Sequence, residues 1–231
     1  PTLLHTLTNP DARVAFRIPN SFADYEHLSS ATWMEFENPD TMVLRAPVVG
    51  DTYDRYYWCS PTQQATYNTL ARIKAGSANY YLGIPTPSSA ITTISPASGV
   101  SATNVTRVYV YTYVSTYGEE GPPSATYTIT GKTDDTYTIT LPSAPGGDTA
   151  NRSLLSRRIY RTVTSSSGVA TYYLVTTLAI ATVSYADSLS DATITINGEL
   201  ESTLWAPPPT DLEGWVAMPN GIFVGWREKE L

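Results

Sequence analysis

Strict two-residue alternation over residues 107–114 is the sequence feature that most constrains how this chain folds. One set of positions carries three valines and a threonine: Val108, Val110, Thr112 and Val114. The positions between them carry tyrosines: Tyr109, Tyr111 and Tyr113. A two-residue period places the two sets on opposite faces of a β-strand. The alternation therefore predicts a strand with a valine face and a tyrosine face.

Composition extends this prediction to the whole chain. The 231 residues are 42% hydrophobic and only 15% charged, which excludes a disordered or a coiled-coil composition. The chain holds 34 threonines and 17 tyrosines but only 3 methionines, and this bias favours strands over helices. The length allows one large domain or two small ones. We expect a mainly β fold with a buried core.

Residues 88–198 carry the most regular pattern. Short apolar or aromatic runs separated by turn residues are expected to be strands at 107–114, 126–130, 136–140, 156–163, 172–175, 182–185 and 192–196. The runs 126–130 and 136–140 are near repeats ten residues apart and predict an antiparallel hairpin. About seven strands with turns every 8–12 residues are typical of an immunoglobulin-like or fibronectin-like β-sandwich.

The flanking regions are less regular. Residues 1–87 predict a β-rich region with strands at 13–18, 41–46, 54–59 and 67–75, and one or two helical turns at 21–28. Residues 199–231 open with a proline-rich linker and continue with apolar runs around Asn220-Gly221, a strong hairpin signal. We expect this hairpin to begin a further β domain, and the chain to be part of a longer protein.

Charge and composition disfavour several functions. The net charge is −7 and the few basic residues are scattered, whereas nucleic-acid binding needs a clustered basic face. No apolar run is long enough for a membrane helix. The chain has one cysteine and two histidines, His5 and His27, so it offers few of the side chains that active sites and metal sites commonly use. We expect no enzyme, no cofactor and no membrane span.

Acidic pairs and the cysteine are the remaining chemical candidates. The acidic groups are Glu35 and Glu37 with Asp40, Asp51 with Asp54, Glu119-Glu120, Asp134-Asp135, and Asp187 with Asp191. Most lie in turn-like stretches, where we expect solvated side chains and simple turns. Cys59 with His27 has the residue types of a nucleophile and a base. Because Cys59 sits on a predicted strand, we expect a small buried side chain instead.

Aromatic and basic side chains on the predicted strands are the candidates for an interaction surface. We name five residues: Tyr109, Tyr111, Tyr113, Arg158 and Tyr160. Aromatic residues are enriched at protein interfaces, and tyrosine can also stack on bases or sugars. The alternative is that this sheet face covers a neighbouring domain or lies half-exposed.

Several segments resemble tail proteins of bacterial viruses. The strand 109–114 followed by Tyr117-Gly118-Glu119-Glu120-Gly121-Pro122-Pro123-Ser124 resembles the signature of fibronectin type III-like modules. The run Arg157-Arg158-Ile159-Tyr160-Arg161-Thr162 resembles a recurrent strand of such modules in phage virion proteins. The stretch from Trp205 to Trp226 resembles the lead into a following β domain. Because the Gly-Glu-Glu-Gly segment lies near the start of the module, the strand order is expected to be permuted.

The resemblance implies a structural protein of the virion tail. Its implied type is a nozzle or hub, with copies of the chain in a ring around the DNA exit channel and contacts to other tail or portal-proximal proteins. DNA contact would be passive rather than sequence-specific. The competing hypothesis is a tail module that binds or degrades host polysaccharide, marked by an aromatic platform such as Trp33 or Tyr56-Tyr57-Trp58 beside paired carboxylates. A third hypothesis is a cell-surface adhesin repeat.

Overall fold

Two compact units make up the structure. The computed structural model describes residues 6–18, 31–48, 50–164 and 170–228. Residues 83–208 form one unit, the sandwich unit, and residues 1–82 with 209–231 form the other, the split unit. The sandwich unit is thus inserted in the chain of the split unit. Strands in antiparallel sheets dominate both, so the predicted mainly β fold class is confirmed.

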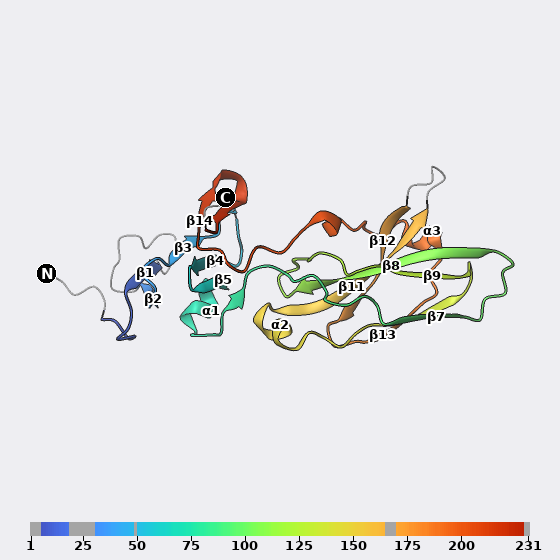
Figure 1. Ribbon diagram of the computed structural model, residues 1–231, viewed down its shortest axis with the longest axis horizontal. Helices are drawn as coiled ribbons and strands as arrows, with labels where there is room; N and C mark the ends of the chain where they lie inside the picture. Colours follow the sequence, from blue (N-terminus) through green and yellow to red (C-terminus); the bar gives the residue numbers. More distant parts are fainter. Residues whose placement is uncertain (1–5, 19–30, 49, 165–169, 229–231) are drawn as a thin grey trace. The chain divides into compact units, whose positions relative to one another are not determined.

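The sandwich unit consists of two antiparallel sheets (Figure 1). The three-stranded sheet has the order β13-β10-β7, with bounds β13 (Ser184–Asp187), β10 (Thr136–Thr140) and β7 (Thr93–Ala97). The four-stranded sheet has the order β12-β11-β8-β9, with bounds β12 (Ala170–Ala179), β11 (Leu154–Thr164), β8 (Asn104–Ser115) and β9 (Tyr127–Lys132). One core cluster takes side chains from both sheets, as in a β-sandwich.

The alternation in β8 is confirmed, but its tyrosine face is the inner one. Tyr109, Tyr111 and Tyr113 are 0%, 1% and 4% exposed and belong to the core cluster. An interaction surface needs accessible side chains, so the prediction that these three tyrosines form one is wrong. Their rings instead fill the space between the sheets, and their hydroxyls find partners: Tyr109 donates to Asp187 and Tyr111 to the carbonyl of Ser89.

The outer face of β8 is buried as well. Val110 packs with Tyr160 and Leu200 in a second cluster, which Tyr172 and Leu174 extend. The segment around residue 199 bridges to the edge strand β12 at Tyr173, and its Leu200 packs on this face. Strand β8 is thus covered on both faces around Val110, and with β11 it is one of the two inner strands of its sheet.

Charged side chains from both sheets meet in the sandwich core. Arg161 of β11 and Asp187 of β13 are both fully buried, and Arg161 Nε lies 2.9 Å from Asp187 Oδ2. The Tyr109 hydroxyl donates to the same carboxylate oxygen at 2.8 Å. Arg161 also donates to Asp191 and to the carbonyl of Leu189. Asp187 is therefore a buried ion-pair partner, which corrects the expectation of a solvated turn residue.

Arg107 continues this network on the four-stranded sheet. Its guanidinium donates to Asp191 and lies 4.5 Å above the ring of Tyr137 on the opposite sheet. Burial and the Asp187 carboxylate together raise the pKa of Tyr109 above its ordinary value. The five side chains Arg107, Tyr109, Arg161, Asp187 and Asp191 are called the sandwich network below.

The expected hairpin between residues 126–130 and 136–140 is wrong. Strand β9 pairs with β8, whereas β10 pairs with β7 and β13 in the other sheet. The turn between them carries the chain from one sheet to the other. Asp135 accepts from the N–H groups of Lys132 and Gly99, and Asp134 accepts from Val100 and Ser101. These bonds fix the crossing, so the two aspartates do belong to a turn.

Two other segments that we expected to be strands are helical in part or throughout. Residues 192–196 were expected to be extended, but α3 (Asp191–Ile194) is helical because Ser190 caps it and accepts from the Thr193 N–H. The strand expected at 67–75 divides into β5 (Gln63–Thr69) and α1 (Leu70–Lys74), where Thr69 is the cap. Helix α2 (Gly146–Asn151) precedes β11.

The split unit has three sheets with β4 at its centre. A two-stranded sheet pairs β1 (Val14–Ile18) with β2 (Thr32–Phe36). A four-stranded sheet has the order β3 (Met42–Arg45), β4 (Arg55–Ser60), β5 and β6 (Tyr80–Tyr81). A two-stranded sheet pairs β14 (Gly214–Met218) with β15 (Ile222–Trp226). The helical turn 21–28, His5 and His27 lie outside the described residues.

Successive side chains of β4 serve opposite faces of the middle sheet. Tyr56 and Trp58 form a core with Ile18, on the side of β1 and β2. Tyr57 instead contacts Phe223 of the terminal hairpin, with ring centroids 4.9 Å apart. The run Tyr56-Tyr57-Trp58 is therefore buried on both faces, so it is not the exposed platform that the polysaccharide hypothesis needs.

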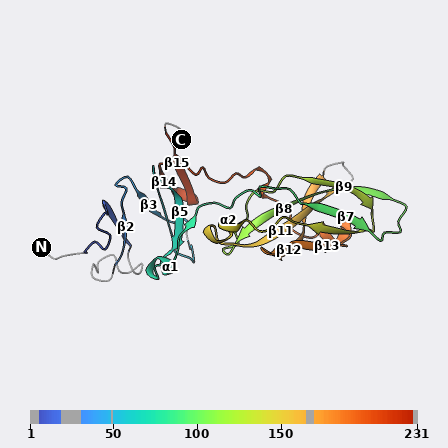
Figure 2. The same cartoon turned by 60° about the horizontal axis from the view of Figure 1, so that its bottom comes forward.

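The hairpin β14–β15 is confirmed, but it packs within the split unit (Figure 2). Trp215 is 1% exposed, lies edge-on to Tyr57, and its indole N–H donates to the carbonyl of Met42. The hairpin thus supplies one wall of an existing core. This corrects the expectation that it only begins a further domain.

We predict that replacing two equally buried arginines of β11 changes the free energy of unfolding by very different amounts. Arg161→Met would leave Asp187 as a buried charge without its cation, at a cost of about 3–5 kcal/mol in the free energy of unfolding. Arg157 is equally buried, but its Nε and Nη2 have no hydrogen-bond partner and Nη1 donates only to the half-buried Pro142 carbonyl. Arg157→Met should change the free energy of unfolding by less than about 1 kcal/mol, because a hydrophobic side chain then replaces a buried charge that pairs with no carboxylate among the described residues.

Urea denaturation followed by circular dichroism measures both variants. Equal losses in the two would contradict the assignment of Arg161 and Asp187 as an ion pair on which the fold depends.

Candidate functional site

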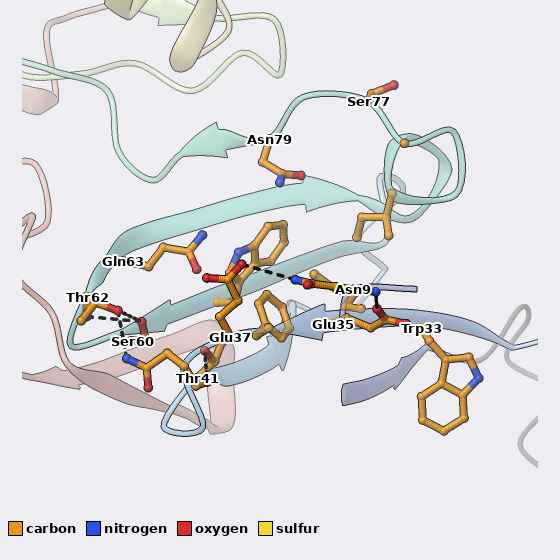
Figure 3. A pocket seen from close by; sticks show the side chains of 16 residues that line it. Asn9, Trp33, Glu35, Glu37, Thr41, Ser60, Thr62, Gln63, Ser77 and Asn79 are labelled. Atoms are coloured by element: carbon orange, nitrogen blue, oxygen red, sulfur yellow. Dashed lines mark hydrogen bonds between the residues drawn. The ribbon is translucent and has the colours of Figure 1, made fainter. Parts of the chain in front are cut away.

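A polar cavity of about 540 Å³ lies in the split unit (Figure 3). Eight of its lining residues carry uncharged polar side chains: Asn9, Asn38, Thr41, Ser60, Thr62, Gln63, Ser77 and Asn79. Two are glutamates, Glu35 and Glu37, and none of the described lining residues is lysine or arginine. Aromatic and apolar residues complete the wall, among them Phe36, Trp58 and Ile73. We call this the polar cavity.

Three segments of the split unit place these groups. Strand β2 supplies Glu35, and Glu37 follows directly after its end. The adjacent turn is fixed by Asn38, whose side chain accepts from the Asp40 N–H and donates to Thr62. Strand β5 supplies Gln63 at its first residue. Sheet pairing holds Glu35 and Gln63, whereas most of the other polar lining residues come from turns and loops.

The two glutamates have different surroundings. Both oxygens of Glu35 accept from Thr8, and Oε2 also accepts from the Asn9 N–H at 2.7 Å. These donors stabilise the charged carboxylate, whereas a glycosidase acid must hold a proton. Glu37 is exposed and accepts only a long bond from the Asn9 amide, 3.4 Å at Oε1. Glu35 and Glu37 are thus brought together, but Glu35 serves to anchor residues 8 and 9.

Several polar groups of the cavity have hydrogen-bonding capacity left over. Among the described residues, the Gln63 side-chain amide and Glu37 Oε2 make no hydrogen bond. Asn79 accepts from the buried Asn68 amide, and its own amide N–H groups are unused. Figure 3 shows Glu37 and Gln63 directed toward one another, with Asn79 on the opposite side of the opening. Trp33 lies at the rim, and its ring points away from these three residues.

The second candidate site is a carboxylate clamp on the sandwich unit. Glu120 accepts from Arg158 at 2.6 Å, from the Tyr160 hydroxyl at 2.8 Å and from the Thr112 hydroxyl. Burial raises the pKa of Tyr160 above its ordinary value, and the hydrogen bond to Glu120 adds to this shift. The clamp brings together Arg158 and Tyr160, both named as interface candidates. Tyr160 is only 3% exposed, so its main contact is internal.

A cavity of about 620 Å³ adjoins the clamp and has an acidic wall. Its carboxylates are Glu119, Glu120, Glu199 and Glu201, and Arg158 is the cation among the lining residues. Trp205 forms part of the lining and is 55% exposed. The tryptophan at the start of the proline-rich linker is thus a surface residue of the sandwich unit.

Cys59 has the properties of a structural side chain. It is fully buried, and burial raises the pKa of its thiol to about 11. A thiol with such a pKa is almost entirely protonated near neutral pH and is a poor nucleophile. The expectation of a small buried side chain is confirmed.

Within the described ranges, no three His, Cys, Asp or Glu side chains converge in a way that could hold a metal ion. None of the helices in this part of the chain combines the length and the apolar character that crossing a membrane requires.

Sequence reasoning missed most of the polar cavity. It named Glu35, Glu37 and Trp33 as candidate carboxylates and platform, but not Gln63 or Asn79. Gln63 begins β5 and Asn79 directly precedes β6, and the two residues share no motif. The only local signal was the run of small polar residues after β4, which also fits an ordinary turn.

We predict that the clamp stabilises the sandwich unit. Glu120→Gln removes the charge that compensates Arg158 and should lower the free energy of unfolding by about 1–2 kcal/mol. Glu119→Gln is the matched control, because Glu119 is exposed and its removal should cost less than about 0.5 kcal/mol. Thermal denaturation of both variants tests this. A Glu119→Gln loss as large as that of Glu120→Gln would refute the clamp.

Comparison of this chain with protein-family models, with curated proteins and with solved structures finds no match.

Proposed function

We propose that this chain is a structural protein of a bacteriophage tail, of the nozzle or hub type, in which copies of the chain form a ring around the DNA exit channel. The proposal starts from the resemblance of two sequence segments to virion modules. The observation that carries it is that these segments contact each other through the clamp. Glu120 of the Gly-Glu-Glu-Gly segment binds Arg158 and Tyr160 of the Arg-Arg-Ile-Tyr-Arg-Thr strand.

Through this contact, both segments help to stabilise the sandwich unit. Alternate residues of the strand point inward, where Arg157 and Arg161 are buried between the sheets. The residues between them point outward and hold Glu120. Both segments thus have structural roles in the same module, as expected for a structural protein.

Charged groups of the sandwich unit support the same conclusion. Asp187 neutralises Arg161, Asp191 binds Arg107 and Arg161, and Asp134 and Asp135 fix a turn. These carboxylates are engaged in holding the fold, which suits a structural role. The overall charge of −7 would repel the phosphates of DNA passing through a ring and so favour sliding over sticking.

Mass spectrometry of purified phage tails combined with cryo-electron microscopy of the virion tests the proposal. We expect peptides of this chain in the tail fraction and several symmetry-related copies of the sandwich unit around the channel. Repeated contacts between identical subunits would stabilise such a ring by mass action. Absence of the peptides from tails, or a single copy away from the channel, would overturn the assignment.

A further inference from the structure

We propose that the polar cavity of the split unit binds a neutral saccharide. This inference goes beyond the proposed function and does not rest on it, because it concerns residues outside the sandwich unit. Its volume of about 540 Å³ lies within the range of roughly 300–1,000 Å³ found for small-molecule sites. The cavity also combines a polar wall with an apolar one.

The first argument is the hydrogen-bonding capacity that remains unused. Glu37 Oε2 can accept, the Asn79 amide can donate, and the Gln63 amide can do both. A sugar hydroxyl is at once a donor and an acceptor. Adjacent hydroxyls on one ring therefore match a carboxylate and two amides that face a common opening, as these three do in Figure 3.

The second argument is charge. Among the described residues, no lysine or arginine lines the cavity, so a phosphate, a carboxylate or a nucleic acid would find no cation there to compensate it. Of the two glutamates, Glu35 is held by the N–H groups of residues 8 and 9. Glu37 has the larger free capacity, and eight uncharged polar residues beside the two glutamates suit a neutral polyhydroxylated ligand better than a cation.

The third argument is the apolar part of the wall. Phe36 and Ile73 are half-buried at the cavity, and Phe36 packs against Trp58 with ring centroids 6.2 Å apart. The C–H faces of a sugar ring need such a surface when its hydroxyls bind elsewhere. Trp33 does not supply this surface, because its ring points away from the opening. The site therefore differs from the Trp33 platform that the sequence suggested.

An array of neutral hexose oligosaccharides, probed with the full 231-residue chain, tests the inference. The best-binding hexasaccharide is then titrated by isothermal titration calorimetry against the chain and its variants. Hexagalacturonate and a chitosan hexamer serve as anionic and cationic comparators. Parallel titration of the monosaccharide separates a polysaccharide ligand, bound much more weakly as a single unit, from a free sugar, bound equally well.

Three substitutions locate the site. Gln63→Ala and Glu37→Ala each remove a ligand-facing group and should weaken binding about tenfold or by somewhat less. Gln64→Ala is the matched control, because Gln64 is the same residue type on the same strand but points to the other face and does not line the cavity. It should bind as the unsubstituted chain does. Circular dichroism and melting temperature verify that all three variants are folded.

We expect a neutral oligosaccharide to bind, the charged comparators to bind more weakly, and only the two cavity variants to lose affinity. Failure of every neutral glycan to bind would overturn the inference. So would a preference for hexagalacturonate or the chitosan hexamer, or unchanged affinity in both cavity variants. Because virion localisation is measured separately, failure here leaves the proposed tail function untouched.

Discussion

The ion pair between Arg161 and Asp187 is the interaction on which the sandwich unit depends. Arg161 belongs to the four-stranded sheet and Asp187 to the three-stranded sheet, so their contact spans the core. A buried pair contributes little when compared with a well-packed hydrophobic replacement, but loss of one partner is costly. The pair therefore acts mainly to fix how the two sheets are aligned. Burial of each charge is costly unless the opposite sheet places its partner beside it.

The remainder of the network follows from this pair. Tyr109 is held inward because its hydroxyl donates to Asp187, and Asp191 is positioned at the start of a capped helical turn where it reaches both Arg161 and Arg107. With the tyrosines committed to the core, the valine side of β8 faces outward and is covered by Tyr160 and Leu200. The clamp at Glu120 then closes over this covered face.

Local pattern predicted most strands, but it missed β2, β6 and β7, and it could not predict how the strands pair. The alternation in β8, the strand around Arg157 and the terminal hairpin are all present, because period and turn chemistry are local properties. Which face of β8 points inward depends on partners such as Asp187, almost eighty residues away. The repeat at 126–130 and 136–140 shows the same limit, since its turn is fixed by the distant residues 99–101 and joins two sheets instead of closing a hairpin.

The candidate sites were predictable only in part, for the same reason. Arg158 and Tyr160 can be named from their strand, but nothing in the sequence distinguishes their partner Glu120 from the other acidic residues of turn-like stretches. Gln63 and Asn79 carry no signal beyond polarity, and only the folding of β5 and β6 near β2 makes them face a cavity. The sequence thus identifies residues whose role is local, whereas it does not identify residues whose role depends on tertiary contacts.

Native-state hydrogen exchange across the two sheets of the sandwich unit tests the central claim most directly. If the buried network joins the sheets into one cooperative unit, backbone amides at the centre of β11 and of β10 will exchange with the same free energy, equal to that of global unfolding. Distinctly faster exchange in β10 and β13, with β11 still protected, would show that the three-stranded sheet opens alone and would contradict the account.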